Sequence, residues 1–261
     1  MTLLAIGNAG VDFGASEIFR DITLTIAAGD RWAVVGRNGT GKTTLIKLIT
    51  GDLTPTRGTV TRQPGLRIAL MDQHRRFPED MSLWDIVAGA FGELRALEHS
   101  LTEQAANLEH DHGEVAMAKY GRDLERFERD GGYQMAAKVD SVLMGVGFDP
   151  EEAKNTRIGT LSGGERGRVA LARQLATPAE VLLLDEPYTG LDVDGAAMLD
   201  TLIRDMRSDG RSLVMTSHDL ERSRTLSDRI AILNRGVIAQ SIASDSLDSA
   251  ALATLYKTNV L

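Results

Sequence analysis

The sequence predicts an α/β fold with a mostly parallel sheet core, an N-terminal antiparallel β subdomain and an inserted helical subdomain. Apolar residues recur with period two over residues 1–76 and with a helical period over residues 77–149. Strand and helix patterns alternate over residues 150–240, and a polar tail fills residues 241–261. At 261 residues, these parts are expected to form a single large domain.

The first and last blocks contain the predicted strands. In the first, apolar and polar positions alternate in two runs, Ile22, Leu24 and Ile26, and then Leu66, Ile68 and Leu70. In the last, apolar runs at residues 181–184, 213–216 and 229–233 predict buried strands. Helices between such strands imply a largely parallel sheet, and a short final helix is expected near residues 250–256.

The middle block is expected to be a helical subdomain that carries a hairpin. Its first apolar stripe consists of Leu83, Ile86, Val87, Ala90, Phe91, Leu94, Leu97, Leu101, Ala105 and Leu108. A break at residues 111–113 separates this stripe from a second one, which ends at Gly131 and Gly132. A third helix is expected over residues 134–144. Residues 93–130 hold ten acidic residues against five Lys and Arg, so the hairpin is acidic.

The composition is that of an ordinary soluble protein, with 43% hydrophobic and 25% charged residues. No apolar run approaches the ~20 residues of a membrane span. The absence of cysteine excludes disulfides and thiol chemistry, which agrees with a cytoplasmic location. The net charge of −8 argues against broad capture of nucleic acid, so no sequence-specific DNA binding is expected.

A glycine-rich run between an apolar strand and an amphipathic helix is the most informative motif. It consists of Gly36, Arg37, Asn38, Gly39, Thr40, Gly41, Lys42 and Thr43, with Thr44 next in the helix. Backbone N–H groups of such a loop point at one anion, so the motif predicts a nucleoside triphosphate site. Lys42 would reach the β- and γ-phosphates, and the Thr43 hydroxyl would bind Mg²⁺.

Two adjacent carboxylates follow the apolar run at residues 181–184. A buried strand delivers acids at its carboxyl end, at the edge of the sheet where the phosphate loop is expected. Asp185 suits Mg²⁺ coordination, and Glu186 suits activation of an attacking water molecule. The simpler alternative is a solvated turn, because Asp-Glu-Pro also ends a strand.

A second helix N-terminus is predicted at residues 162–165. Ser162 and Glu165 have the spacing of a capping box. Gly163 and Gly164 exceed what a cap requires, and they would leave the helix end bare enough to receive another phosphate.

Together, these motifs resemble the nucleotide-binding domain of ATP-binding cassette (ABC) proteins over roughly residues 3–240, which implies a P-loop NTPase fold of the ABC type. By this resemblance, Gln73 links Mg²⁺ and the γ-phosphate to the helical subdomain, and Asp192 belongs to a loop that joins two ATP sites. His218 resembles the switch histidine that senses the γ-phosphate, although a packed or capping histidine is the simpler alternative. Phe13 resembles the aromatic residue that stacks on adenine, with Phe19 as the competing candidate.

The resemblance also implies a mechanism, in which water attacks the γ-phosphorus of ATP in line. Glu186 would be the base, Lys42, Gln73 and His218 would complete the catalytic group, and the cofactors would be ATP and Mg²⁺. In this family, a loop such as residues 162–165 completes the ATP site of another subunit. The chain is therefore expected to pair with a second ABC domain, most simply as a homodimer.

Two biological roles fit such an ATPase. The first is a soluble ABC-F-like protein associated with the ribosome, which the long helical block and the residues at 127–133 and 161–166 resemble. The second is the ATP-binding subunit of a membrane transporter, peripheral at the inner face of the membrane and docked on a separate transmembrane subunit. Residues 228–236 resemble transporter subunits, and residues 188–192 differ from the sequence usual in ABC-F proteins. ABC-F proteins also normally carry two cassettes on one chain.

The acidic hairpin bears on this choice. An arm that touches ribosomal phosphates is expected to offer Lys and Arg, yet acidic residues outnumber them here. A solvated helical face without a partner is the plain alternative. The helical block nevertheless favours the ABC-F-like role narrowly, with the transporter subunit as the alternative.

Overall fold

A computed structural model describes residues 1–14, 16–71, 77–108, 113–189, 191, 193–206 and 210–260. The chain consists of two compact units, Met1–His74 with Ala179–Leu261, and Arg75–Pro178. The described strands all belong to the first unit, and the second is helical. The helical unit extends past residue 149, the boundary expected from the sequence. It does so because α7 (Gly163–Ala176) packs against α2 (Leu83–Ala88) and α5 (Met135–Gly145).

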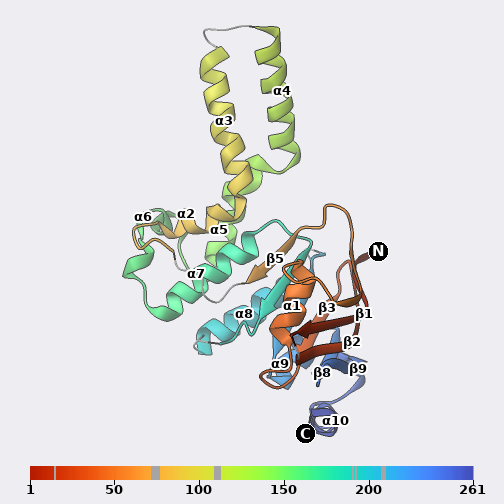
Figure 1. The fold of residues 1–261 in the computed structure, drawn as a ribbon. Coiled ribbons are helices and arrows are strands. Elements are labelled where there is room, and N and C mark those ends of the chain that lie inside the picture. Colours follow the sequence, from red (N-terminus) through yellow and green to blue (C-terminus); the bar gives the residue numbers. More distant parts are fainter. Residues whose placement is uncertain are drawn as a thin grey trace. The chain divides into compact units, whose positions relative to one another are not determined.

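In the described part of the chain, one mixed sheet has the strand order β4-β1-β2-β9-β8-β3-β7-β6-β5. The strands are β1 (Thr2–Phe13), β2 (Ser16–Ala27), β3 (Arg31–Val35), β4 (Arg57–Arg62), β5 (Ile68–Met71), β6 (Val181–Asp185), β7 (Ser212–Ser217), β8 (Arg229–Asn234) and β9 (Val237–Ala243). β1 pairs antiparallel with β2 and β4, whereas β8, β3, β7, β6 and β5 are parallel neighbours (Figure 1). The predicted parallel core and antiparallel N-terminal strands are confirmed.

Register brings three strand ends to one edge of the sheet. β7 lies between β3 and β6, so that Val35 pairs with Ser217 and Asp185 pairs with Thr216. Parallel neighbours end at the same edge, which is where α/β sheets bind their ligands. The glycine-rich loop after β3, the two acids at the end of β6 and the histidine after β7 therefore face a common space.

The core of the sheet unit follows the predicted alternation. Ile22, Leu24 and Ile26 are buried on one face of β2. Helix α1 (Lys42–Thr50) lays its apolar side chains against the same cluster, and these are Leu45, Ile46, Leu48 and Ile49. Full burial of each such side chain contributes about 1.5–3 kcal/mol, which fixes α1, and with it the loop that precedes it, on the sheet.

Most of the remaining predicted elements form within a few residues of their expected bounds. The third helix is α5, and the final helix is α10 (Ser249–Val260). A short helix that was not predicted, α6 (Pro150–Asn155), begins at an Asp149 cap. In the sheet unit, α8 (Val193–Asp205) follows β6 and α9 (Leu220–Leu226) follows β7. None of the described helices combines the length and the apolar character needed to cross a membrane.

The apolar stripe over residues 83–108 forms two helices and not one. The 3₁₀ turn η1 (Gly89–Phe91) separates α2 from α3 (Gly92–Leu108). Arg173 of α7 occupies this turn, with Nη1 donating to Ile86 O at 3.2 Å and Nη2 donating to Gly89 O at 3.3 Å. A Cβ on Gly89 would lie 2.8 Å from Arg173 Nη1, so a side chain there would have to shift the guanidinium. The guanidinium thus satisfies carbonyls that the break in the helix releases.

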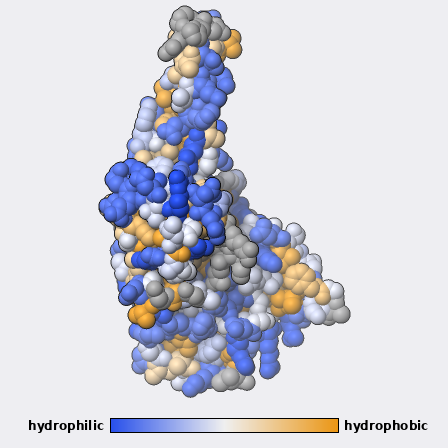
Figure 2. All heavy atoms as spheres, turned by 90° about the vertical axis from the view of Figure 1, so that its left-hand side faces the viewer, coloured by the Kyte–Doolittle hydropathy of each residue, from blue (hydrophilic) through white to orange (hydrophobic). Residues whose placement is uncertain are grey.

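Helices α3 and α4 (Glu114–Arg129) run side by side as the expected hairpin (Figure 1). Hydrophilic side chains run along the hairpin in Figure 2, with apolar ones among them. At the N-terminal end of α4, Val115 is 83% exposed and Met117 is 58% exposed. At the other end of α4, buried Phe127 packs edge-to-face on Tyr133, with ring centroids 5.3 Å apart.

Gly132 is predicted to be essential for the base of the hairpin. It lies in η2 (Gly132–Gln134), and an added Cβ would approach the Phe127 ring to 2.3 Å. Gly132→Ala should lower the free energy of unfolding by about 1–3 kcal/mol, because the ring must leave its packed position. Gly121→Ala is the matched control: it lies within α4, where a Cβ meets nothing within 4 Å, and should stabilise by about 0.5–1 kcal/mol. Urea unfolding followed by circular dichroism measures both, and equal stabilities for the two variants would contradict this packing.

Candidate functional site

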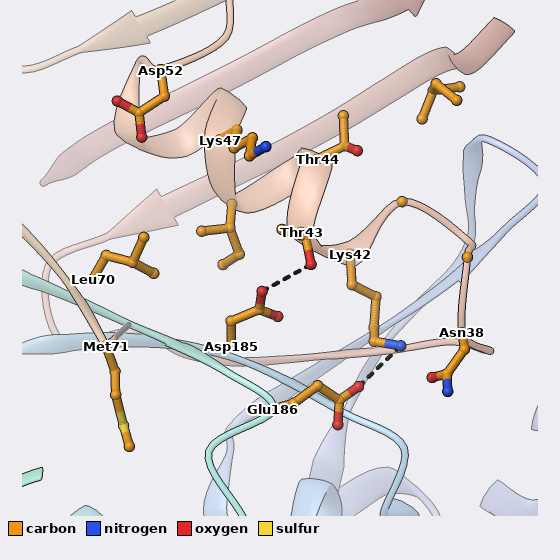
Figure 3. Close-up of a pocket in the computed structure, with 14 residues that line it drawn as sticks. Asn38, Lys42, Thr43, Thr44, Lys47, Asp52, Leu70, Met71, Asp185 and Glu186 are labelled. Carbon is orange, nitrogen blue, oxygen red and sulfur yellow. Dashed lines mark hydrogen bonds and ion pairs between the residues drawn. The ribbon is translucent and has the colours of Figure 1, made fainter. Parts of the chain in front are cut away.

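A cavity of about 690 Å³ opens at the carboxyl edge of the parallel strands (Figure 3). Its volume is in the range of small-molecule sites. The lining includes several residues predicted from sequence, namely Asn38, Gly39, Gly41, Lys42, Thr43, Thr44, Asp185 and Glu186. The glycine-rich loop, the start of α1 and the end of β6 therefore surround one space in the sheet unit.

The loop before α1 has the conformation of an anion cradle. Gly41 has a φ of 102°, and a Cβ there would lie 2.6 Å from the buried Phe19 ring, so the turn into α1 requires glycine. Thr40 Oγ1 donates to Arg37 O at 2.9 Å and closes the loop on itself. The first backbone N–H groups of α1 have no partner within the helix, and they end at the cavity.

Lys42 places its ammonium at the mouth of this loop. The side chain is only 7% exposed, and Nζ donates to Gly36 O at 2.9 Å and to Arg37 O at 3.3 Å. The same Nζ lies 3.0 Å from Glu186 Oε1, as Figure 3 shows. An ammonium group among oxygen atoms at this loop fits the predicted contact with a phosphate.

Asp185 connects the sheet to the start of α1. Thr43 Oγ1 donates to Asp185 Oδ2 at 2.9 Å (Figure 3). From the neighbouring strand, Thr216 Oγ1 donates to Asp185 Oδ1 at 2.5 Å. A hydroxyl and a carboxylate side by side are hard oxygen ligands. Mg²⁺ is bound in just this way, through one or two protein oxygens together with substrate phosphates and water. The residues present therefore fit the predicted Mg²⁺ position.

Glu186 lies between two cationic or hydrogen-bonding groups. Its Oε2 is 2.9 Å from His218 Nδ1, and its Oε1 faces Lys42. The backbone of Glu186 has a φ of 47°, a left-handed conformation that is costly for a non-glycine residue and is typical of functional sites. His218 is 71% exposed, so its ring borders open solvent as well as the carboxylate.

Thr216 is a site residue that the sequence analysis did not single out. Besides its bond to Asp185, its Oγ1 accepts a hydrogen bond from the Glu186 backbone N–H at 2.9 Å. The side chain is fully buried at the end of β7. A hydroxyl in the otherwise apolar run at residues 213–216 was the available signal, because a buried polar group needs a partner.

The residues at 162–165 lie in the helical unit. They form the predicted capping box, in which Ser162 Oγ accepts from Glu165 N at 3.3 Å and Glu165 Oε2 accepts from Ser162 N at 2.9 Å. Hydrogen bonds from the Ser162 side chain and backbone hold the pKa of the Glu165 carboxyl below its usual value. A Cβ added to Gly163 would meet nothing within 4 Å, and Gly164 follows it in the first turn of α7.

The two candidate adenine-stacking residues differ in their exposure. Phe13 ends β1 and is 54% exposed, whereas Phe19 is fully buried in the core beneath Gly41. Phe19 is therefore a core residue, and Phe13 stays the predicted stacking partner. Gln73 and Asp192, which the sequence analysis placed in the site, lie outside the described residues.

The comparisons with known proteins agree with this geometry. Residues 19–189 match the ABC transporter family model. The chain is 36% identical over 241 residues to the zinc import ATP-binding protein ZnuC of Cereibacter sphaeroides, covering 92% of this chain and 82% of that protein. It is 30% identical over 236 residues to the ATP-binding protein Uup of Haemophilus influenzae, covering 90% of this chain and 35% of that protein. The chain spans about a third of the length of the first curated relatives it matches.

A solved structure of the ATP-binding subunit of an ABC transporter superposes with a TM-score of 0.70 at 20% identity, covering 98% of this chain and 99% of that chain. This likeness confirms the predicted fold. The phosphate loop, the paired acids and the family match together define the class: the chain belongs to the ATP-binding cassette family of ATPases.

Substituting the two phenylalanines should separate nucleotide binding from stability. Phe13→Ala removes an exposed ring and should weaken ATP binding by about tenfold with little change in unfolding free energy. Phe19→Ala leaves a core cavity and should cost about 3–5 kcal/mol of stability. Nucleotide titration by fluorescence and urea unfolding measure the two effects. Unchanged ATP affinity in Phe13→Ala would exclude it as the stacking residue.

Proposed function

We propose that this chain is the ATP-binding subunit of an ABC membrane transporter, which couples ATP binding and hydrolysis to movement of a separate transmembrane subunit. The similarity to ZnuC carries this proposal, because it extends over 92% of this chain and 82% of that protein. A relative that is matched over most of its own length is a better guide to role than one that is matched over a third of its length. The transporter-like residues at 228–236, which form β8 and its turn, support the same conclusion.

The helical block alone favoured an ABC-F-like role, and the similarity to ZnuC instead favours the transporter subunit. An ABC-F-like role is the second candidate, and two observations favour it: the α3/α4 hairpin and the similarity to Uup. The charge of the hairpin works against ribosomal phosphates as a partner, since acids outnumber Lys and Arg by ten to five over residues 93–130.

The geometry supports a specific division of labour in ATP hydrolysis. Lys42 binds the β- and γ-phosphates at the loop mouth and neutralises their charge. When bound, Mg²⁺ at Thr43 and Asp185 supplies further charge neutralisation on the transferred phosphoryl group. Glu186 orients the attacking water and accepts its proton. His218, 2.9 Å from Glu186, holds that carboxylate and contacts the γ-phosphate from the open side.

The second half of the proposed ATP site comes from another ABC domain, most simply a second copy of this chain. Ser162, Gly163 and Gly164 open α7, and a helix N-terminus with little side-chain cover can bind a phosphate. Closing two such chains around ATP, and reopening them after hydrolysis, would provide the movement delivered to the membrane partner.

Glu186→Gln should retain ATP binding while lowering the hydrolysis rate by at least about 100-fold, because the amide cannot accept the proton from water. The trapped complex should then elute as a dimer in ATP, as measured by size exclusion with light scattering. Glu180→Gln is the matched control, since Glu180 precedes the same strand but pairs with Arg67 at 3.0 Å at its opposite end. Rapid multiple-turnover hydrolysis by Glu186→Gln would remove Glu186 as the base.

The two candidate roles predict different cellular partners. Tagged Glu186→Gln, loaded with ATP in a lysate of its own cells, should sediment with membranes, and stripping membrane proteins from the vesicles should abolish this. Wild-type chain with ADP is the control and should be enriched less, because the closed dimer is not held. Sedimentation with ribosomes would contradict the transporter role and favour the second candidate. Recovery in the supernatant alone would contradict both.

A further inference from the structure

A polar cluster close in sequence to Glu186 and His218 has no role in the mechanism described above. Tyr188 lies two residues after Glu186, and its hydroxyl donates to Asp200 Oδ1 of α8 at 2.7 Å. Arg222 of α9 lays its guanidinium over the Tyr188 ring, with Cζ 4.5 Å from the ring centroid. A phenol and a guanidinium from separate elements thus meet over one carboxylate.

Arg222 also reaches the loop that carries His218. Its Nη1 donates to Asp219 Oδ2 at 3.2 Å, and its Nε lies 3.4 Å from Asp200 Oδ1. Asp219 directly follows His218, and it caps α9 by accepting from the Arg222 backbone N–H at 3.0 Å. One side chain therefore contacts the segments that follow both members of the Glu186–His218 pair.

We propose that Tyr188, Asp200 and Arg222 form a brace that positions Glu186 against His218 during ATP hydrolysis. Two connections then join the same two segments. In the first, Glu186 Oε2 and His218 Nδ1 are 2.9 Å apart, and in the second, the brace links Tyr188 to Asp219 through Arg222. These are positioning residues, and this inference rests on the proposed hydrolytic function.

Glu186 needs such support because its backbone is strained. A φ of 47° is uncommon for glutamate, and it persists only where surrounding contacts determine it. Thr216 fixes the Glu186 N–H from one side, at 2.9 Å. The turn that follows is closed by Thr189 N–H donating to Glu186 O at 3.0 Å, and Tyr188 anchors that turn to α8.

The partial burial and the charges of the three brace residues favour a fixed arrangement. Arg222 and Asp200 are 35% and 18% exposed, so their attraction is only partly screened by water. Burial, and after it the hydrogen bond to Asp200, raises the pKa of the Tyr188 phenol above its ordinary value. The phenol therefore keeps its proton, and its bond to Asp200, throughout the physiological pH range.

The test is steady-state ATP hydrolysis by the full chain carrying Tyr188→Phe, which removes only the hydroxyl. We expect kcat to fall by about tenfold, with KM for ATP and the ATP dissociation constant within about twofold of wild type, because a displaced base slows chemistry and not binding. Arg222→Lys keeps the charge but loses the planar guanidinium that stacks on Tyr188 and contacts two carboxylates. It should likewise lower kcat and leave KM for ATP nearly unchanged. Arg224→Gln is the matched control on the same helix: Arg224 pairs with Glu221 at 2.9 Å and should leave both constants unchanged.

A double-mutant cycle separates a positioning role from a purely structural one. In single-turnover hydrolysis, Tyr188→Phe should add no further loss to Glu186→Gln, because the brace acts only through that carboxylate. Additive losses, wild-type kcat in both brace variants, or a rise in KM equal to the fall in kcat would each overturn the brace. Wild-type chain without any ATPase activity would instead overturn the proposed function, and the brace with it.

Discussion

The structure of the site depends on the two oxygens of one carboxylate. Asp185, at the end of β6, accepts from Thr43 at the start of α1 and from Thr216 at the end of β7, so it connects the helix after the glycine-rich loop to two neighbouring strands. Hydrogen bonds to an ionised carboxylate are stronger than neutral ones. This tie is possible only because β7 lies between β3 and β6, which brings the three strand ends into register. Lys42 and Glu186, each next in sequence to one of these bonded residues, thereby come to line the same cavity.

Much of this arrangement could be predicted from local sequence pattern. Buried parallel strands are short continuous apolar runs, and residues 181–184, 213–216 and 229–233 all form strands. Proximity of Asp185 to Thr43 followed from the rule that parallel strands end at one edge. These predictions needed only the period of the apolar residues and the rule about strand ends. They did not require the order of the strands in the sheet.

Other features depend on long-range contacts that periodicity does not contain. The role of Thr216 requires the strand order, because its partner Asp185 is 31 residues away. The break at Gly89 is bound by Arg173, which is 84 residues further along the chain. Likewise, the meeting of Tyr188, Asp200 and Arg222 depends on how α8 and α9 are rotated on the sheet. Helical period predicted the stripes but not the side chain that interrupts one of them.

For the biological role too, one segment of the chain gives less information than the whole chain. The α3/α4 hairpin is one inserted segment. Its length and its acidic charge describe the surface of that segment only. The similarity of the chain to ZnuC extends over nearly all of it, sheet and helices together. A proposal about the whole chain is better founded on the extent of that match than on one inserted segment.

The hairpin has one mechanical consequence. With 17 residues, α3 is about 25 Å long, and its partner α4 stiffens it along that length. A tilt of about 10° at the base would carry the far end through about 4 Å. A small rotation at the base of the hairpin would therefore move its far end by more than the diameter of a water molecule.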